Sequence, residues 1–455
     1  MKRDFVARRR WLALFVALFG LSQALLWYAS YAGGAKALIG DEQTYQATAL
    51  AILDGGRWMP GTIWPPLQPL WLALLYALFG VHVWVAQLAQ TVLFIASAAL
   101  LRDFWRRLGG GVAAANTAAA LFLLNPATAA YAHWLWPETL HLFLLLAALC
   151  LLARARALAA GIAVGFAILA KSLLSVFWPA FLLVFVRRGR SREGVRLAFA
   201  FVFGLGLVTA PALWHGWREY GKPMIADSSI YNLWVGLTDR WRSDYVQDMG
   251  GVTLPEFLTS AATPQQRNAI YLDKVRALVE AHGVPALLGA QLGRQYFRLF
   301  SAKTPLVSQL PGAACAGHLS AYHTPAWLTR GLIAANDLLH ALVLAAAAFG
   351  IAGWRRRPDR LFVLVALFTA YQLALFLLIH VKARFLLPLL PFLCGFAGSA
   401  LVALRRRIAA DPRAIASSDD LLRFTPPRIA AGVALAVLLL FLAFAGPLLD
   451  GLCAA

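Results

Sequence analysis

Long apolar runs separated by short arginine clusters dominate the chain, and this alternation predicts an all-α integral membrane protein. A helix needs roughly 20 predominantly apolar residues to cross the hydrocarbon core, and short cytoplasmic loops are rich in Lys and Arg. The run 11–31 follows the basic segment 1–10, so its start is predicted to be cytoplasmic and its end to face outward. Keeping each short basic loop inside predicts about eleven spans: residues 11–31, 83–101, 112–130, 138–152, 157–171, 173–186, 197–214, 326–352, 361–379, 385–404 and 429–449.

Two regions do not fit a full crossing. Residues 67–80 are short and lie between Pro65-Pro66 and Gly80, which predicts an interfacial or half-inserted helix. Residues 215–325 carry mixed charges and predict a mostly helical outer region, with an amphipathic helix at 264–280 and a segment resting on the membrane at 284–300. The predicted organisation is therefore a module 1–214 with a helical first outer loop 32–82, an outer region 215–325 and C-terminal membrane helices 326–455.

Composition supports a membrane protein and argues against a soluble, a nucleic-acid-binding or a disulfide-rich protein. The chain is 61% hydrophobic and 14% charged, with a mean hydropathy of +0.67, outside the range of soluble domains. The net charge of +20 comes largely from arginine clusters between apolar runs, a distribution that faces anionic lipid rather than nucleic acid. Four scattered cysteines imply neither a disulfide framework nor a cysteine metal site. The first apolar run is too long for an ordinary signal peptide, so it is expected to be retained.

The predicted topology puts several ionisable side chains on the outer face. Polar groups at membrane depth are costly and usually functional, so their convergence predicts a site: Asp41, Glu42, Glu138, Lys171, His380, Lys382 and Arg384.

Each of these residues also has a structural interpretation. Asp41 and Glu42 could form a solvated pair that caps the following helix, and Glu138 could be a first-turn acid favoured by the helix dipole. Lys171 could extend its ammonium to the interface, and His380 could hydrogen-bond within the bundle. Lys382 and Arg384 could be plain interfacial charges.

Several motifs resemble a known superfamily. Residues 40–46 (GDEQTYQ), 53–58 (LDGGRW) and 64–71 (WPPLQPLW) are similar to the first outer loop of GT-C glycosyltransferases. The branch with the aminoarabinose transferases of lipid A and the protein O-mannosyltransferases matches best, and 210–214, 221–224, 228–236 and 384–391 resemble later parts of it. The chain departs from the pattern at Trp64, where the aminoarabinose transferases usually carry Lys, and at Val381 and Lys382, which replace the Lys and Glu of a lipid-linked mannosyltransferase motif.

The resemblance implies a GT-C-like helical bundle that transfers a sugar from a polyprenyl phosphate at the outer membrane face, with inversion at the anomeric carbon. In such a reaction a carboxylate can remove the acceptor's proton, a role assigned to Asp41, while Glu42 positions the acceptor or a metal. The leaving phosphate needs cationic donors, which are Arg384 with Lys382 or Lys171.

The remaining predicted roles concern substrate binding and metal. Glu138 is predicted to bind sugar hydroxyls, and Tyr45, Trp64 and His380 are predicted to contact substrate. Asp41, Glu42 and Glu138 would allow a divalent cation, although no ligand spacing demands one.

The implied partners are a polyprenyl-phosphate-linked sugar, a glycan, lipid or protein acceptor, and membrane lipids, with no nucleic acid. A chain rich in Ala and Arg suggests a GC-rich bacterial genome. Together with the predicted topology and the resemblance, this implies a multi-pass protein of the bacterial inner membrane, with the N-terminus cytoplasmic and the site periplasmic. A transporter or flippase of a lipid-linked saccharide is the main alternative, although no internal repeat typical of transporters is evident. A binding or scaffolding membrane protein is a third.

Overall fold

Helices make up nearly all of the regular structure. The computed structural model describes residues 2–31, 34–38, 40–59, 63–185, 192–238, 250–302, 325–355, 359–408 and 422–449. Within these ranges the only β pairing is an isolated bridge between Trp354 and Leu422. The predicted all-α fold class is therefore confirmed.

Five helices in the described part are long and apolar enough to cross a membrane. These helices are α1 (Lys2–Tyr31), α4 (Val83–Arg107), α9 (Arg192–Tyr220), α14 (Ala326–Gly353) and α18 (Pro426–Leu449). Shorter apolar helices also occur: α3 (Leu67–Phe79), α5 (Val112–Leu124), α7 (Glu138–Ala153), α8 (Ala157–Ala170), α13 (Val284–Arg294) and α15 (Arg360–Leu375). The chain is a multi-pass membrane protein, but the predicted number of eleven full spans is not confirmed.

Three of the predicted spans are not single α-helices. The run 112–130 breaks at Asn125, whose side chain accepts a hydrogen bond from the Thr128 N–H and caps the short helix α6 (Pro126–Tyr131). The run 173–186 forms the 3₁₀ turns η1 (Ser172–Leu174) and η2 (Trp178–Val184) in its described part.

The third case is the run 385–404. It starts in the 3₁₀ turn η6 (Ala383–Leu386), and its α-helix α16 (Leu390–Ile408) begins only after Pro388. Proline has no N–H to donate to the preceding turn, so a continuous helix from residue 385 is disfavoured.

Small residues let the helices approach closely. A Cβ at Gly204 of α9 would run into the backbone of Leu158 in α8, and a Cβ at Gly398 of α16 would meet the backbone of Ala114 in α5. Where lipid replaces water, association depends on such close packing rather than on the hydrophobic effect. Trp105 fills the core between α4 and α16 and donates its indole N–H to Ser399.

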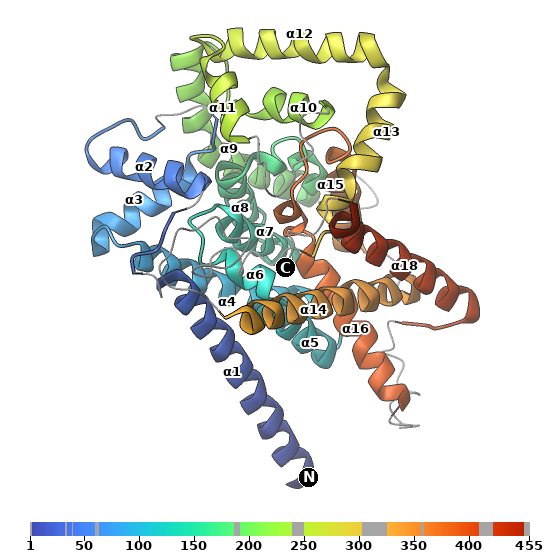
Figure 1. The fold of residues 1–455 in the computed structure, drawn as a ribbon. Coiled ribbons are helices and arrows are strands. Elements are labelled where there is room, and N and C mark those ends of the chain that lie inside the picture. Colours follow the sequence, from blue (N-terminus) through green and yellow to red (C-terminus); the bar gives the residue numbers. More distant parts are fainter. Residues whose placement is uncertain are drawn as a thin grey trace.

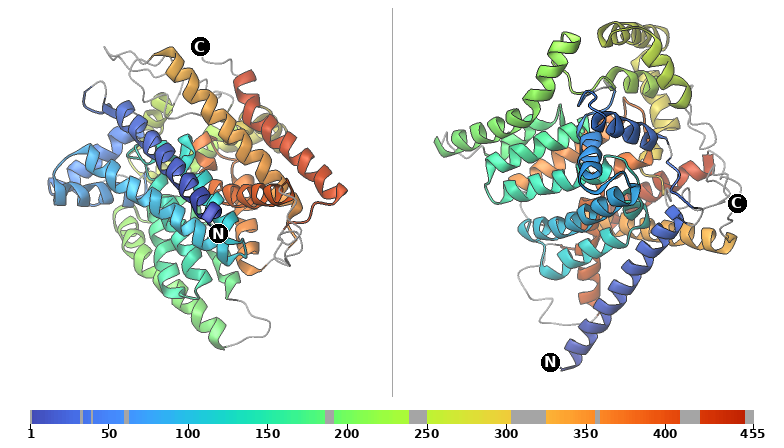
Figure 2. Two further views of the ribbon diagram at one scale, coloured as in Figure 1. Left: turned by 90° about the horizontal axis from the view of Figure 1, so that it is seen from below. Right: turned by 90° about the vertical axis from the view of Figure 1, so that its left-hand side faces the viewer.

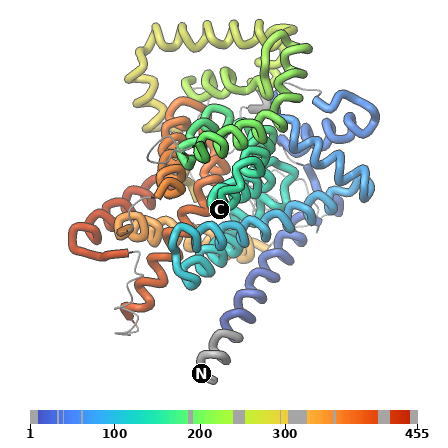
Figure 3. Tube along the Cα trace, turned by 180° about the vertical axis from the view of Figure 1, so that it is seen from behind, coloured from blue at the N-terminus to red at the C-terminus, as the bar shows by residue number. Residues whose placement is uncertain are grey.

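The helices of the predicted outer region form a layer at one end of the molecule. In Figure 1 α12 (Pro264–His282) crosses the top, with α10 (Ser229–Leu237) and α11 (Gly250–Thr259) beneath it and α13 beside them. The N-terminal half of α1 projects from the opposite end, as Figures 2 and 3 also show. Residues 239–249 and 303–324 of the predicted outer region lie outside the described residues.

The layer has its own small core and its own anchors. Trp234, Phe257 and Tyr271 pack together at its centre. A capping box between Thr263 and Gln266 starts α12. Arg267 of α12 donates from Nη2 to the buried Asp227 Oδ2 at 3.3 Å, which ties α12 to the segment just before α10. The 3₁₀ turn η4 (Tyr296–Leu299) follows α13 and leads to α14.

The close contact of α8 and α9 can be tested with two glycines of α9. Replacing Gly204 with Ala should destabilise the fold by about 1–3 kcal/mol through overpacking. Gly206→Ala is the control, because nothing lies within 4 Å of the position that its Cβ would take, and it should be neutral or add up to about 1 kcal/mol of helix propensity. Thermal unfolding in detergent distinguishes the two, and equal midpoints would contradict the close approach.

Candidate active site

A guanidinium between two carboxylates forms the centre of the site. Arg384 donates from Nη2 to Asp41 Oδ2 at 2.9 Å, and its Nε lies 3.7 Å from Glu138 Oε1. Lys171 Nζ donates to the same Glu138 oxygen at 3.1 Å. Four charges that are far apart in the sequence thus form one chain of ion pairs, which we call the charge chain: Asp41, Arg384, Glu138 and Lys171.

Each member of the charge chain stands at the end of a helical element. Asp41 is the first residue of α2 (Asp41–Leu53), directly after Gly40, whose φ of 56° suits glycine. Glu138 begins α7 after Pro137, and Lys171 follows α8 in an extended conformation. Acids at helix N-termini and cations at C-termini are favoured by the helix dipole. The contacts across the sequence show that these residues do more than stabilise their own helices.

Exposure differs along the charge chain. The Asp41 side chain is 27% exposed and that of Arg384 14%, whereas Glu138 is buried at 4%. The second oxygen of Glu138, Oε2, is buried and has no hydrogen-bond partner among the described residues. An accessible carboxylate and a buried oxygen that could accept a hydrogen bond therefore flank the same guanidinium.

The pKa directions agree with a charged centre. Burial alone would lower the pKa of Arg384, but the Asp41 and Glu138 carboxylates outweigh it and raise that pKa. Burial also raises the pKa of Tyr45 well above its usual value, with Asp41 and Glu138 adding to the effect.

Aromatic side chains line the cations. The Arg384 guanidinium lies 4.5 Å from the Trp136 ring centroid, and Lys171 Nζ lies 4.7 Å from that of Phe385. Tyr45 packs against Trp64, with ring centroids 6.0 Å apart. Sequence reasoning missed Trp136 and Phe385, because aromatic residues at helix ends are common as plain interfacial anchors.

Glu42 does not join the charge chain. It is 0% exposed, binds Lys36 Nζ at 2.6 Å and accepts the Leu135 N–H at 2.9 Å. Burial lowers the pKa of Lys36, while the Glu42 carboxylate opposes that shift. Lys36 was not among the predicted site residues, because a lone Lys before an acidic pair gives no sign of burial.

The carboxylates predicted to hold a divalent cation do not gather. Among the described residues no three His, Cys, Asp or Glu side chains form a group that could hold a metal ion. Asp41 and Glu138 are both paired with Arg384, while Glu42 is engaged by Lys36. The possible cation site at Asp41, Glu42 and Glu138 therefore has no support in this part of the chain.

His380 and Lys382 precede Arg384 in the same segment. The His380 main-chain N–H donates to the Asn232 carbonyl of α10 at 3.0 Å, and its ring lies edge-on to Phe385 at 6.5 Å. Lys382 is the residue before η6, in an extended conformation. His380 thus connects the Arg384 segment to α10 and the layer of helices around it.

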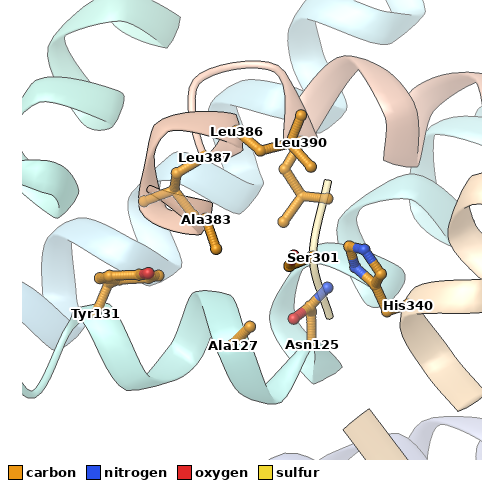
Figure 4. Close-up of a pocket in the computed structure, with 9 residues that line it drawn as sticks. All are labelled: Asn125, Ala127, Tyr131, Ser301, His340, Ala383, Leu386, Leu387 and Leu390. Carbon is orange, nitrogen blue, oxygen red and sulfur yellow. The ribbon is translucent and has the colours of Figure 1, made fainter. Parts of the chain in front are cut away.

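A pocket lies beside this segment. It is formed between α6, α14 and the segment around η6 (Figure 4). Ala383, which lines it, directly precedes Arg384 in the sequence. Leu386, Leu387 and Leu390 provide apolar walls. His340 also faces it and is bound through Nε2 to the Phe300 carbonyl at 2.9 Å.

Solved structures similar to the chain include those of AglB and ArnT. AglB, an archaeal oligosaccharyltransferase from Archaeoglobus fulgidus in complex with an inhibitory peptide and a dolichol-phosphate, matches 94% of this chain at 11% identity with a TM-score of 0.45. The chain spans 55% of the length of AglB. ArnT from Cupriavidus metallidurans matches in the apo state, with 18% identity, 87% of this chain, 78% of ArnT and a TM-score of 0.36.

ArnT bound to undecaprenyl phosphate matches 88% of this chain and 79% of ArnT, at 18% identity and a TM-score of 0.33. No protein-family model and no curated protein matches the chain. Because the TM-scores lie below 0.5, the function has to be argued from the residues of the site itself.

The pairing at Arg384 can be tested by stability. Arg384→Met should lower the free energy of unfolding by about 3–5 kcal/mol, because it leaves two carboxylates without their shared partner. Arg57→Met is the control: Arg57 is 69% exposed and pairs with Glu219 at 3.0 Å, so its loss should cost at most about 1 kcal/mol. Unfolding midpoints in detergent that fall equally in both variants would contradict the central pairing.

Proposed function

We propose that the chain is a GT-C-type glycosyltransferase that moves a sugar from a polyprenyl-phosphate donor to an acceptor hydroxyl or phosphate at the outer face of the membrane. The charge chain carries this proposal, because it combines an accessible carboxylate with two cations. A base for the incoming group and positive charge for a departing phosphate are the two needs of such a transfer. The bacterial inner membrane, with the N-terminus cytoplasmic and the site periplasmic, belongs to the same proposal.

For a hydroxyl acceptor, the reaction uses Asp41 as the general base. Asp41 takes the hydroxyl proton while the acceptor oxygen attacks the anomeric carbon from the side opposite the phosphate. The carbon–oxygen bond to the phosphate breaks, and the phosphate leaves with the electron pair, so the anomeric configuration inverts. No acid is needed on the leaving side, because a phosphate leaves readily as an anion held by cations.

Arg384 and Lys171 receive the developing charge. Arg384 has five N–H donors, and its contacts with Asp41 and Glu138 use Nη2 and Nε, so further donors can face a phosphate. Lys171 adds a point charge beside Glu138. Glu138 Oε2 can accept a hydrogen bond from a sugar hydroxyl. The leucines of the neighbouring pocket suit the hydrocarbon next to the phosphate.

The pairing of Asp41 with Arg384 suggests an order of events. A phosphate that binds the guanidinium competes with the Asp41 carboxylate for the same N–H donors. Donor binding therefore loosens Asp41 and allows it to accept a proton. In this scheme the base becomes available when the donor is in place, which limits loss of sugar to water.

Asp41→Asn tests the proposal directly. The substitution keeps the size of the side chain but removes the base, so donor consumption should fall by about 10²- to 10⁴-fold. Asp54→Asn is the control, because Asp54 lies exposed at the end of the same helix, and it should react as wild type does. The measurement is sugar release and transfer from a panel of polyprenyl-phosphate sugars by purified protein.

Two results would contradict parts of this proposal. Full turnover in Asp41→Asn would remove Asp41 as the base. If wild type consumes no donor while lipid-linked sugar changes leaflets in vesicles, the chain is a transporter and not a transferase.

A further inference from the structure

Two segments without α-helix carry the centre of the site. The first, residues 132–137, contains Trp136 and leads to Glu138; we call it the tryptophan strap. The second, residues 376–389, contains Arg384; we call it the arginine strap. Outside a helix the main-chain carbonyls lose their regular partners, and a buried carbonyl without a hydrogen bond is costly.

Buried glutamines supply partners along the tryptophan strap. The carbonyl oxygens of residues 133, 134 and 135 accept hydrogen bonds from the side chains of Gln87, Gln90 and Gln68 at 2.9, 2.7 and 2.9 Å. All three glutamines are 0% exposed. Gln68 lies on α3 and the other two on α4, so two helices hold three consecutive peptide units.

The arginine strap has the same arrangement. Gln291 of α13 donates to the carbonyls of Phe376 and Ile379, at 3.2 and 3.0 Å. Gln372 of α15 donates to the carbonyl of Phe385, the residue after Arg384. Both glutamines are buried. The two straps thus depend on the same chemistry, supplied by four different helices.

The amide oxygens of these glutamines indicate that the N–H donors are the functional part of the side chains. The amide oxygens of Gln68, Gln90, Gln291 and Gln372 are buried and accept no hydrogen bond from the described residues. An unpartnered acceptor costs stability, so these side chains are retained for their N–H donors. A methionine of similar shape would avoid that cost but would leave the strap carbonyl unpaired.

Glu42 attaches α2, the helix that begins with the proposed base Asp41, to the tryptophan strap. It accepts the Leu135 N–H of the tryptophan strap at 2.9 Å, and it is the neighbour of Asp41 on α2. The helix that carries Asp41 is therefore fastened to the segment that leads to Glu138. Any shift of this strap would move Asp41 and Glu138 relative to Arg384.

We propose that the buried glutamines and Glu42 are positioning residues that hold the two straps in register, so that Asp41, Glu138 and Arg384 meet. Their effect on catalysis rests on the proposed function, whereas their effect on the straps does not. This assigns Glu42 a place in the support of the site rather than among the groups that touch substrate. It also assigns a role to glutamines that the sequence motifs did not single out.

The experiment compares Gln90→Met with Gln43→Met. The Gln90 side chain donates to the Trp134 carbonyl, while the exposed Gln43 donates to the Leu38 carbonyl outside both straps. Hydrogen–deuterium exchange in detergent should show faster exchange over residues 133–138 in Gln90→Met, by about fivefold for the loss of one hydrogen bond. Gln43→Met should leave that segment unchanged.

Turnover of a polyprenyl-phosphate sugar that wild type consumes is the second measurement. Gln90→Met should lower kcat by about 10- to 100-fold through misplacement of the strap, with KM for the donor nearly unchanged. In a Glu138→Gln background the same substitution should cause a smaller further loss, because the part of its effect that passes through Glu138 is already absent there. Equal losses in both backgrounds would indicate general damage to the fold and overturn the positioning role.

The outcomes separate this inference from the proposed function. If hydrogen–deuterium exchange over residues 133–138 is unchanged in Gln90→Met, Gln90 does not hold the tryptophan strap, whatever the activity. Faster exchange with unchanged kcat overturns its role in catalysis. If wild type consumes no donor, the proposed function fails and the catalytic role falls with it, while the exchange result still decides whether Gln90 holds the strap.

Discussion

The pairing of one guanidinium with two carboxylates is the interaction on which the arrangement of the chain depends. Arg384 binds Asp41, which lies 343 positions earlier in the sequence, and also faces Glu138. A charge that is largely withdrawn from water is tolerated only when it is paired. With Lys171 the group contains two positive and two negative charges. The start of α2, the α7–α8 pair and the arginine strap must therefore all meet at one place.

This meeting point explains why helices end where they do. Inside a helix, a side chain points sideways and the backbone is already hydrogen-bonded. At a helix end the chain can turn, and the local dipole favours acids at the N-terminus and cations at the C-terminus. Asp41 and Glu138 each begin a helix, and Lys171 follows one. The cost is a set of main-chain groups without helical partners, and Gln68, Gln90 and Gln372 satisfy some of them.

The same reasoning shows what could be predicted from the sequence. The apolar runs predicted an all-α membrane protein, and the rule that basic loops stay inside put Asp41, Glu138, Lys171 and Arg384 on one face. Their mutual pairing was not predictable, because hydropathy gives sidedness but no distances. Breaks at Asn125 and after Pro388 were also missed. Both breaks carry a local signal, Asn125-Pro126 and Pro388, but the long apolar runs on either side outweighed it in the prediction.

The adjacent pair Asp41 and Glu42 shows most clearly which features of the site could not be predicted from the sequence. In the sequence they are two carboxylates in one motif, and both were assigned to the reaction. On a helix, neighbouring side chains point about 100° apart, so one can face the site while the other faces the interior. Asp41 is 27% exposed and binds Arg384, whereas Glu42 is fully buried between Lys36 and the Leu135 N–H. Two side chains with the same chemistry are thus divided by packing: one carboxylate is open to an incoming group, and the other holds the segment that aligns the first.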